Sequence, residues 1–185
     1  QKALLDKEII SILQKSVKLY SEYADTTLLF IFKKNKTDMY NFYEVRFGHI
    51  NFMHLAGIKS KTLTASEFYH ACLSGTITQE DCSPKRDKPT MDSKLRILEQ
   101  MLDLRNSKCY KIGEKTLITR DNDFEMATGN SNGTLGYDSR INIPKTHKID
   151  KSKSAIPTTL LSNAITSYCP NPQKITFILQ KSDSE

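Results

Sequence analysis

The chain has 185 residues, of which 38% are hydrophobic and 26% are charged, and its formal net charge is +6. This length predicts one domain with a single packed core. The apolar run at residues 28–32 is too short to cross a bilayer. The first residues also lack the basic segment and apolar core of a signal peptide, so we expect no membrane partner. The surplus of Lys and Arg favours a polyanionic partner such as RNA, because cations that meet phosphates release counterions. An inert basic surface is the alternative that charge alone leaves open.

The cysteines do not form a recognisable site. Cys72, Cys82, Cys109 and Cys169 are widely and irregularly spaced, without a C-x-x-C pair. This spacing argues against a zinc site. We expect reduced thiols in a cytoplasmic protein, with no metal and no cofactor. Because the chain begins with Gln1, we also expect it to be part of a longer polypeptide.

The first sixty residues predict a helix, a hairpin and a short helix. Apolar side chains recur at helical spacing over residues 3–23, which predicts an amphipathic helix. Residues 26–33 form a β-rich run, and residues 39–47 form a second one after a polar turn, so the two predict a β-hairpin. A short helical pattern over residues 51–56 ends at Gly57.

Two longer helices are predicted next. Thr64 can cap the first of them, with Glu67 three residues later as in a capping box, and Gly75 ends it. The second covers residues 91–104, where an apolar stripe indicates a core-facing side: Leu95, Leu98, Met101 and Leu102.

The later part of the chain changes to a period of two, which predicts short strands. They cover residues 109–112, 116–119, 124–128, 134–137 and 175–179, with Asn132-Gly133 as a turn. The order of elements predicts an α+β fold in which N-terminal helices pack on a mainly antiparallel sheet. Residues 140–153 are basic and contain a proline, so we expect an exposed loop there.

Histidines are concentrated in one part of the chain. Three of the four, His49, His54 and His70, lie between Tyr43 and Gly75. Imidazole has an unperturbed pKa near neutrality, so this clustering favours acid–base chemistry.

The residues around His54 carry a resemblance to a known family. The distinctive segment is N-F-M-H-L-A-G-I-K at residues 51–59, with Y-E-V-R-F before it at 43–47 and F-Y-x-A after it at 68–71. This stretch resembles a phage-associated group within the barnase, EndoU, colicin and RelE-like nucleases. The likeness continues more loosely through residues 94–104, 135–137 and 156–159.

The resemblance implies a barnase/RelE-like α+β fold, with the helices on one face of the sheet and the RNA-binding cleft on the opposite face. It also implies a metal-independent endoribonuclease, or a ribonuclease-like toxin domain of phage or mobile-element origin, that cleaves RNA through attack of the 2′-hydroxyl. Residues 38–185 would form the nuclease domain, and residues 1–37 an N-terminal helix and first strand, within one continuous domain 1–185. A cognate antitoxin or immunity protein and the oligomeric state are left open.

The chemistry of such a reaction selects the candidate catalytic residues. Metal-free cleavage needs a base at the 2′-hydroxyl, an acid at the 5′-oxygen and positive charge at the phosphorane. His54 is the candidate for the base or the acid, and Arg46 and Lys59 are the candidates for charge stabilisation. Thr158 completes the predicted catalytic set as a ligand of a phosphate oxygen. The family's usual His-Leu-Thr-Gly reads H-L-A-G here, so that hydroxyl is missing from this chain.

Other residues are candidates for contact with RNA. Tyrosine rings can stack on bases, and cations and hydroxyls can meet phosphates. The predicted RNA-binding residues are Tyr43, Tyr69, Tyr137, Thr159, Arg140, Lys145, His147, Lys148, Lys151 and Lys153.

Each assignment has a structural alternative. His54 could be a core histidine bonded to the backbone, Arg46 and Lys59 could be solvated charges, and Thr158 or Thr159 could cap a helix. His49 or His70 could complete a two-histidine acid–base pair, or make ordinary surface contacts. The alternative functions are therefore a catalytically inactive nucleic-acid-binding or protein-interaction domain of the same fold, and a structural or regulatory phage protein with no nucleic-acid partner.

Overall fold

A computed structural model describes residues 2–34, 36–105, 110–116, 124–139 and 154–182. The α-helices in these ranges are α1 (Asp6–Ser21), α2 (Asn51–Leu55), α3 (Ala65–Ser74) and α4 (Lys88–Leu102). The main sheet contains β1 (Thr26–Lys33), β2 (Tyr40–Phe47), β5 (Lys111–Glu114), β6 (Met126–Gly129), β7 (Thr134–Asp138), β8 (Ile156–Leu161) and β9 (Gln173–Lys181). A separate short ladder joins β3 (Ile58–Lys59) to β4 (Ser83–Pro84), and η1 (Gln79–Asp81) and η4 (Ile165–Ser167) are short 3-10 helices.

The main sheet is antiparallel and strongly curled. Its strands follow the order β2-β1-β9-β5-β6-β7-β8, and each neighbouring pair is antiparallel. The two outer strands approach each other, because a bridge pairs Val45 of β2 with Ala155, the residue before β8. The Arg46 amide donates to the Ala155 carbonyl over 2.8 Å, and the Ala155 amide donates to the Glu44 carbonyl over 3.3 Å. The predicted α+β fold with a mainly antiparallel sheet is confirmed.

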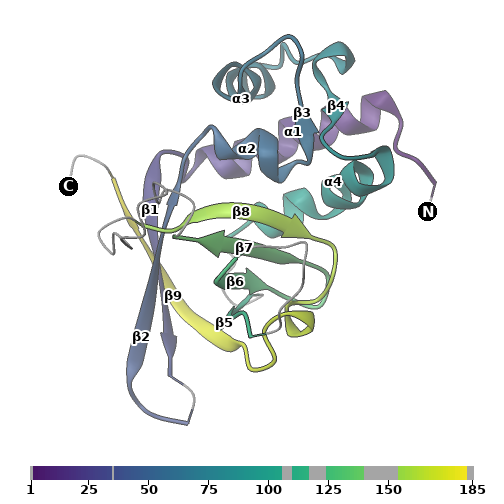
Figure 1. Ribbon diagram of the computed structural model, residues 1–185. Helices are drawn as coiled ribbons and strands as arrows, with labels where there is room; N and C mark the ends of the chain where they lie inside the picture. The colour runs from purple at the N-terminus through teal and green to yellow at the C-terminus, as the bar shows by residue number, and fades with distance from the viewer. Residues whose placement is uncertain (1, 35, 106–109, 117–123, 140–153, 183–185) are drawn as a thin grey trace, which may run out of the picture.

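The helices gather on one side of this sheet (Figure 1). Tyr20 of α1 is fully buried there, and its ring centroid lies 5.3 to 6.4 Å from the rings of four neighbours, Tyr23, Phe47, Phe52 and Tyr69. Burying one such side chain stabilises a fold by about 1.5–3 kcal/mol. This aromatic cluster fixes α2 and α3 against α1 and β2, and so fixes the segment that carries the histidines.

Several local predictions from the sequence are confirmed. The hairpin pairs Thr26 with Phe47 at one end and Lys33 with Tyr40 at the other. The capping box of α3 is present, since the Thr64 side chain accepts from the Glu67 amide and the Glu67 carboxylate accepts from the Thr64 amide. Most of the strand predicted at residues 116–119 lies outside the described residues.

In the last third of the chain, the structure contains a strand, β8, that the sequence pattern does not predict. Thr158 and Thr159 do not cap a helix, because both lie within β8. Pro157 is tolerated there since β8 is the outermost strand and the register with β7 shifts between Gly136 and Tyr137. Proline has no amide to donate, so it is confined to such edge or bulge positions.

The N-terminal segment is part of the same packing unit as the rest. β1 pairs with both β2 and β9, and the buried side of α1 joins the main hydrophobic core. In the described parts of the chain, every helix is either too short or too polar to cross a membrane.

Candidate active site

His54 projects from α2 toward the outer strand β8. Phe52 and Leu55 of the same short helix are fully buried and anchor it to the core, which leaves His54 partly buried between them. Its Nε2 lies 2.7 Å from the carbonyl oxygen of Thr158, and its Nδ1 lies 2.6 Å from Nζ of Lys85. Both ring nitrogens therefore have defined partners from other elements.

These partners determine which nitrogen carries the proton. A carbonyl oxygen only accepts hydrogen bonds, so Nε2 must donate and holds the hydrogen of the neutral ring. Nδ1 then presents its lone pair to the Lys85 ammonium, which only donates. The contact with Lys85 lies on the exposed side of the ring, so the basic nitrogen is the one that faces solvent.

Two lysines give this site its electrostatic character. Burial and then the nearby Lys85 ammonium hold the pKa of His54 below its ordinary value of 6.5, with a smaller effect from Lys94, although the hydrogen bond to Thr158 acts in the opposite direction. Burial, and then the charge of Lys85, also lower the pKa of Lys94. The result is a neutral imidazole at pH 7 beside two ammonium groups, an arrangement suited to a base that acts on an anionic substrate.

Gly57 allows the lysines to approach His54. It has a φ of +72°, and a Cβ built on it would lie 2.9 Å from Cδ of Lys94. Its carbonyl accepts from the Lys85 amide over 2.9 Å. The glycine therefore bonds the backbone of one lysine and leaves space for the side chain of the other.

We expect Gly57→Ala to destabilise the fold by about 1–2 kcal/mol, because L-residues are strained at positive φ. It should also displace Lys94 and so raise the pKa of His54 toward 6.5. Urea unfolding and an NMR titration of the imidazole would measure the two effects. Gly75→Ala is the matched control, since Gly75 has a φ of +80° but its built Cβ meets its nearest atom at 3.8 Å. It should show a comparable loss of stability and no change in the pKa of His54; equal pKa shifts in both variants would contradict this role of Lys94.

The other predicted catalytic residues are placed differently. Thr158 contacts His54 through its carbonyl oxygen, while its hydroxyl donates to the Gly136 carbonyl over 3.3 Å. Arg46 lies on β2, where its Nη1 donates to the Asp25 carbonyl over 3.3 Å, so it belongs with Asp25 and His49. Lys59 is exposed on β3 opposite Ser83. Within the described ranges, the cations that act on the pKa of His54 are Lys85 and Lys94.

The tyrosines predicted to stack on bases are largely enclosed. Tyr137 is fully buried, with its hydroxyl 2.6 Å from that of Thr128, and Tyr69 is 5% exposed against Tyr20 and Phe52. In this structure the core covers both rings, so neither presents a face to solvent on which a base could stack. Tyr43 is partly buried and donates to a carboxylate oxygen of Glu125 over 2.6 Å.

The remaining predicted RNA contacts can be placed only in part. Thr159 lies partly buried on β8, opposite Gly136 of β7. The basic candidates of the predicted loop, Arg140, Lys145, His147, Lys148, Lys151 and Lys153, lie outside the described residues.

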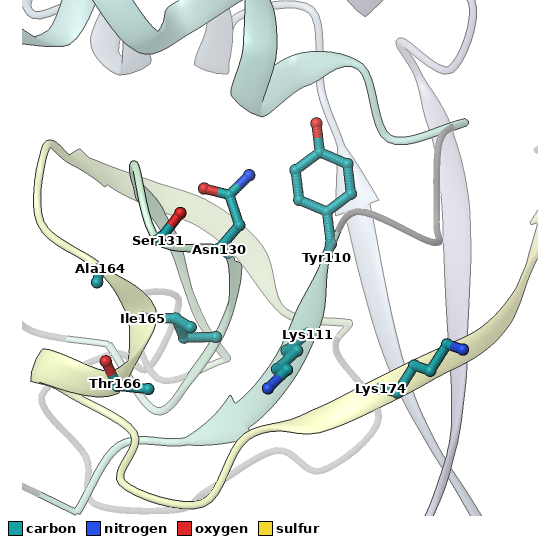
Figure 2. Close-up of a pocket in the computed structure, with 9 residues that line it drawn as sticks. Tyr110, Lys111, Asn130, Ser131, Ala164, Ile165, Thr166 and Lys174 are labelled. Atoms are coloured by element: carbon teal, nitrogen blue, oxygen red, sulfur yellow. The ribbon is translucent and has the colours of Figure 1, made fainter.

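A separate hollow of about 370 Å³ lies away from His54, among β5, the β6–β7 turn and η4 (Figure 2). Lys111 and Lys174 are directly opposite each other in the β5–β9 register, but their ammonium groups point in different directions in Figure 2. Asn130, Ser131 and Thr166 add amide and hydroxyl groups. Among the described residues, neither histidine nor carboxylate side chains line this hollow, so those residues offer it polar contacts but no acid–base pair.

Sequence reasoning selected His54 but missed Lys85 and Lys94. Lys85 lies in a polar break between helices and Lys94 in the middle of one, positions where a solvated lysine is the ordinary expectation. Only the β3–β4 ladder and the packing of α4 bring them to the imidazole. The sequence contains no spacing signal for this arrangement.

One family model matches most of the chain. Residues 12–185 match the family model PBECR4, described as phage-Barnase-EndoU-ColicinE5/D-RelE like nuclease 4. The match begins within α1, so it spans the N-terminal segment as well as the later part of the chain. No curated protein and no solved structure matched the chain.

Proposed function

Since the chain belongs to the PBECR4 family of phage-Barnase-EndoU-ColicinE5/D-RelE-like nucleases, we propose that it is a metal-independent endoribonuclease in which His54 is the general base. The observation that carries the proposal is the pair of contacts at the imidazole. Nε2 is fixed by the Thr158 carbonyl, and the lone pair of Nδ1 faces a cation on the exposed side. A base prepared in this way is unprotonated at pH 7 and lies where a phosphate can approach.

The proposed reaction uses the site's own residues throughout. The Lys85 ammonium binds the RNA phosphate instead of Nδ1, which frees the lone pair of Nδ1. Nδ1 then accepts the proton of the 2′-hydroxyl. The 2′-oxygen forms a bond to phosphorus and the bond to the 5′-oxygen breaks, which leaves a 2′,3′-cyclic phosphate. Lys85 stabilises the charge that gathers on the phosphorane. Lys94, whose pKa is lowered by burial, gives a proton to the departing 5′-oxygen.

Other residues would extend the contact with RNA. Lys59 is exposed on β3, and the partner strand β4 leads directly into Lys85, so its charge suits the neighbouring backbone phosphates. Thr159 and the basic residues of segment 140–153 are proposed as further contacts, supported by the net charge of +6. Toxin action, phage or mobile-element origin and a cytoplasmic site of action are likewise proposals, supported by the family description and by the free thiols of Cys72, Cys82 and Cys169.

A second function is favoured by one observation. Lys85 occupies Nδ1 at 2.6 Å, and if this contact persists with RNA bound, the imidazole cannot act as a base. The domain would then bind nucleic acid, or a partner protein, without cleaving. The two functions differ in their products.

The test is cleavage of an oligonucleotide with a single ribonucleotide, incubated with the protein in excess chelator. We expect a 2′,3′-cyclic phosphate end at the ribonucleotide, and no cleavage of the matched oligonucleotide with a 2′-deoxy position there. Loss of activity in the chelator, or cleavage of the deoxy substrate, would contradict the mechanism. Salt-sensitive binding without any product would instead support the non-cleaving module.

A further inference from the structure

A second histidine forms a continuous hydrogen-bonded chain with an aspartate and a serine. Nδ1 of His49 lies 2.9 Å from both carboxylate oxygens of Asp25, and Nε2 of His49 lies 2.8 Å from Oγ of Ser66. The three residues come from the α1–β1 turn, the β2–α2 connection and the first turn of α3. The nuclease mechanism uses none of them.

The Asp25 carboxylate determines which nitrogen of His49 carries a hydrogen. Burial alone would raise the pKa of Asp25, but the hydrogen bonds from the backbone and ring of His49 and the charge of Arg46 hold it below the ordinary value. Asp25 is therefore ionised and only accepts, so Nδ1 of His49 carries a hydrogen, and in the neutral ring Nε2 presents its lone pair to the Ser66 hydroxyl. This is the tautomer opposite to that of His54, and the one in which a histidine can take a proton from serine.

The aspartate is held in this position by the backbone. Asp25 has a φ of +58°, and its amide donates to the Phe47 carbonyl over 2.6 Å. Its carboxylate also accepts from the His49 amide over 3.0 Å. The carboxylate thus fixes both the backbone and the ring of His49, which is the orienting role of the acidic member of a triad.

Ser66 opens onto a shallow hollow of about 510 Å³ along the outer side of α3, where Ala71 and Leu73 supply apolar surface. Ser66 is the second residue of α3, and the amides of a first helical turn have no carbonyl one turn earlier to bond. The Glu67 amide already donates to the Thr64 hydroxyl, so the amides of Ala65 and Ser66 are the ones that would hold a developing oxyanion. A nucleophile, its base and an orienting acid therefore occur together beside a hollow with some apolar surface, which Glu67 and His70 also line.

From this arrangement we propose that Asp25, His49 and Ser66 form a catalytic triad that hydrolyses esters of short carboxylic acids. Ser66 Oγ forms a bond to the carbonyl carbon while its proton passes to Nε2 of His49, and that proton then leaves with the alcohol as the ester bond breaks. Water attacks the acyl-serine, its proton passes to His49, and the carboxylic acid departs as Ser66 regains a hydrogen. Asp25 stays ionised throughout.

The proposal is tested with a fluorophosphonate probe, which reacts with activated serines, and with hydrolysis of p-nitrophenyl acetate. We expect mass spectrometry to find the probe on Ser66, and Ser66→Ala to abolish labelling and ester turnover. Asp25→Asn keeps the size of the side chain but removes its charge, and should slow turnover by on the order of 10²–10⁴-fold. Ser93→Ala, a change to a partly buried serine of α4, is the matched control and should behave as the parent.

Circular dichroism and thermal unfolding would show that each variant is folded. A folded parent protein that remains unlabelled at Ser66 would overturn the proposal. So would ester turnover that is the same in Ser66→Ala as in Ser93→Ala, because the hydrogen-bonded chain would then only join α3 to the α1–β1 turn. Because the probe reports on Ser66 itself, neither outcome depends on whether His54 cleaves RNA.

Discussion

Replacing His54 with Gln should lower kcat/KM for RNA cleavage by about two to four orders of magnitude, the usual contribution of a general base. The glutamine amide can still donate to the Thr158 carbonyl, as Nε2 of the imidazole does at 2.7 Å, but it cannot accept a proton. The fold should therefore persist while the chemistry is lost. Initial rates on the single-ribonucleotide substrate would measure the effect, with thermal unfolding to show that the variant is folded.

His70→Gln is the control for this substitution. His70 is an exposed histidine on α3, so the same chemical change is made outside the proposed site. We expect its cleavage rate to match that of the parent. A His54→Gln variant that retained the rate of His70→Gln would show that His54 is structural and that the base lies elsewhere.

Replacing Lys85 with Met should change both the rate and its dependence on pH. Lys85 helps to hold the pKa of His54 below 6.5, so its removal should raise that pKa toward the ordinary value. Because the unprotonated ring is the active form, the acidic limb of the kcat/KM profile should move to higher pH. Loss of the stabilising charge should also lower the rate at pH 8 by about 10²–10³-fold, as for other lost contacts to a transition-state anion.

The free energy of unfolding should also decrease as the pH falls, as the cleavage rate does. The folded state holds His54 at a lowered pKa, so below pH 6.5 the unfolded chain binds more protons at this ring than the folded chain does. The contribution of His54 is therefore present above about pH 6.5 and is lost as pH falls through the lowered value. Lys85→Met should reduce this dependence, because it brings the two pKa values closer together.

Arg86→Met is the matched control for Lys85→Met. Arg86 is the next residue, and its exposed guanidinium lies 3.9 Å from Asp87 rather than at the imidazole. Its removal should leave the acidic limb where it is in the parent. A limb that moved equally in both variants would reflect the general loss of a positive charge, and the contact between Lys85 and His54 would then have no specific role.

The helices and the hairpin could be predicted because their signals are local. The capping box of Thr64 and Glu67 and the terminating Gly75 mark the ends of α3 directly. Alternation of apolar and polar residues predicts a strand, and it also shows which side of the strand is buried when only one side is buried. For β7 this signal fails, since every residue of Thr134–Asp138 is buried. The sequence pattern therefore does not show that Tyr137, a predicted RNA contact, lies in the core.

The cations of the site could not be predicted for a related reason. Lys85 follows β4 and Lys94 lies on α4, and each meets His54 only after the chain has folded back on itself. The same holds for Asp25 and Ser66, which approach His49 from opposite directions along the sequence. A family resemblance can select the imidazole, but the partners that decide its tautomer come from tertiary packing.

The bridge between Val45 and Ala155 also limits how this protein can associate. An outermost strand normally offers a row of unpaired amides and carbonyls to which another chain can add a strand. Where the two rims of the curled sheet meet, those groups already bond each other, so strand addition is blocked. Among the described residues, none pairs with the outer edge of the far half of β2, where Tyr40 and Phe42 are exposed, so that part of the rim can accept an added strand.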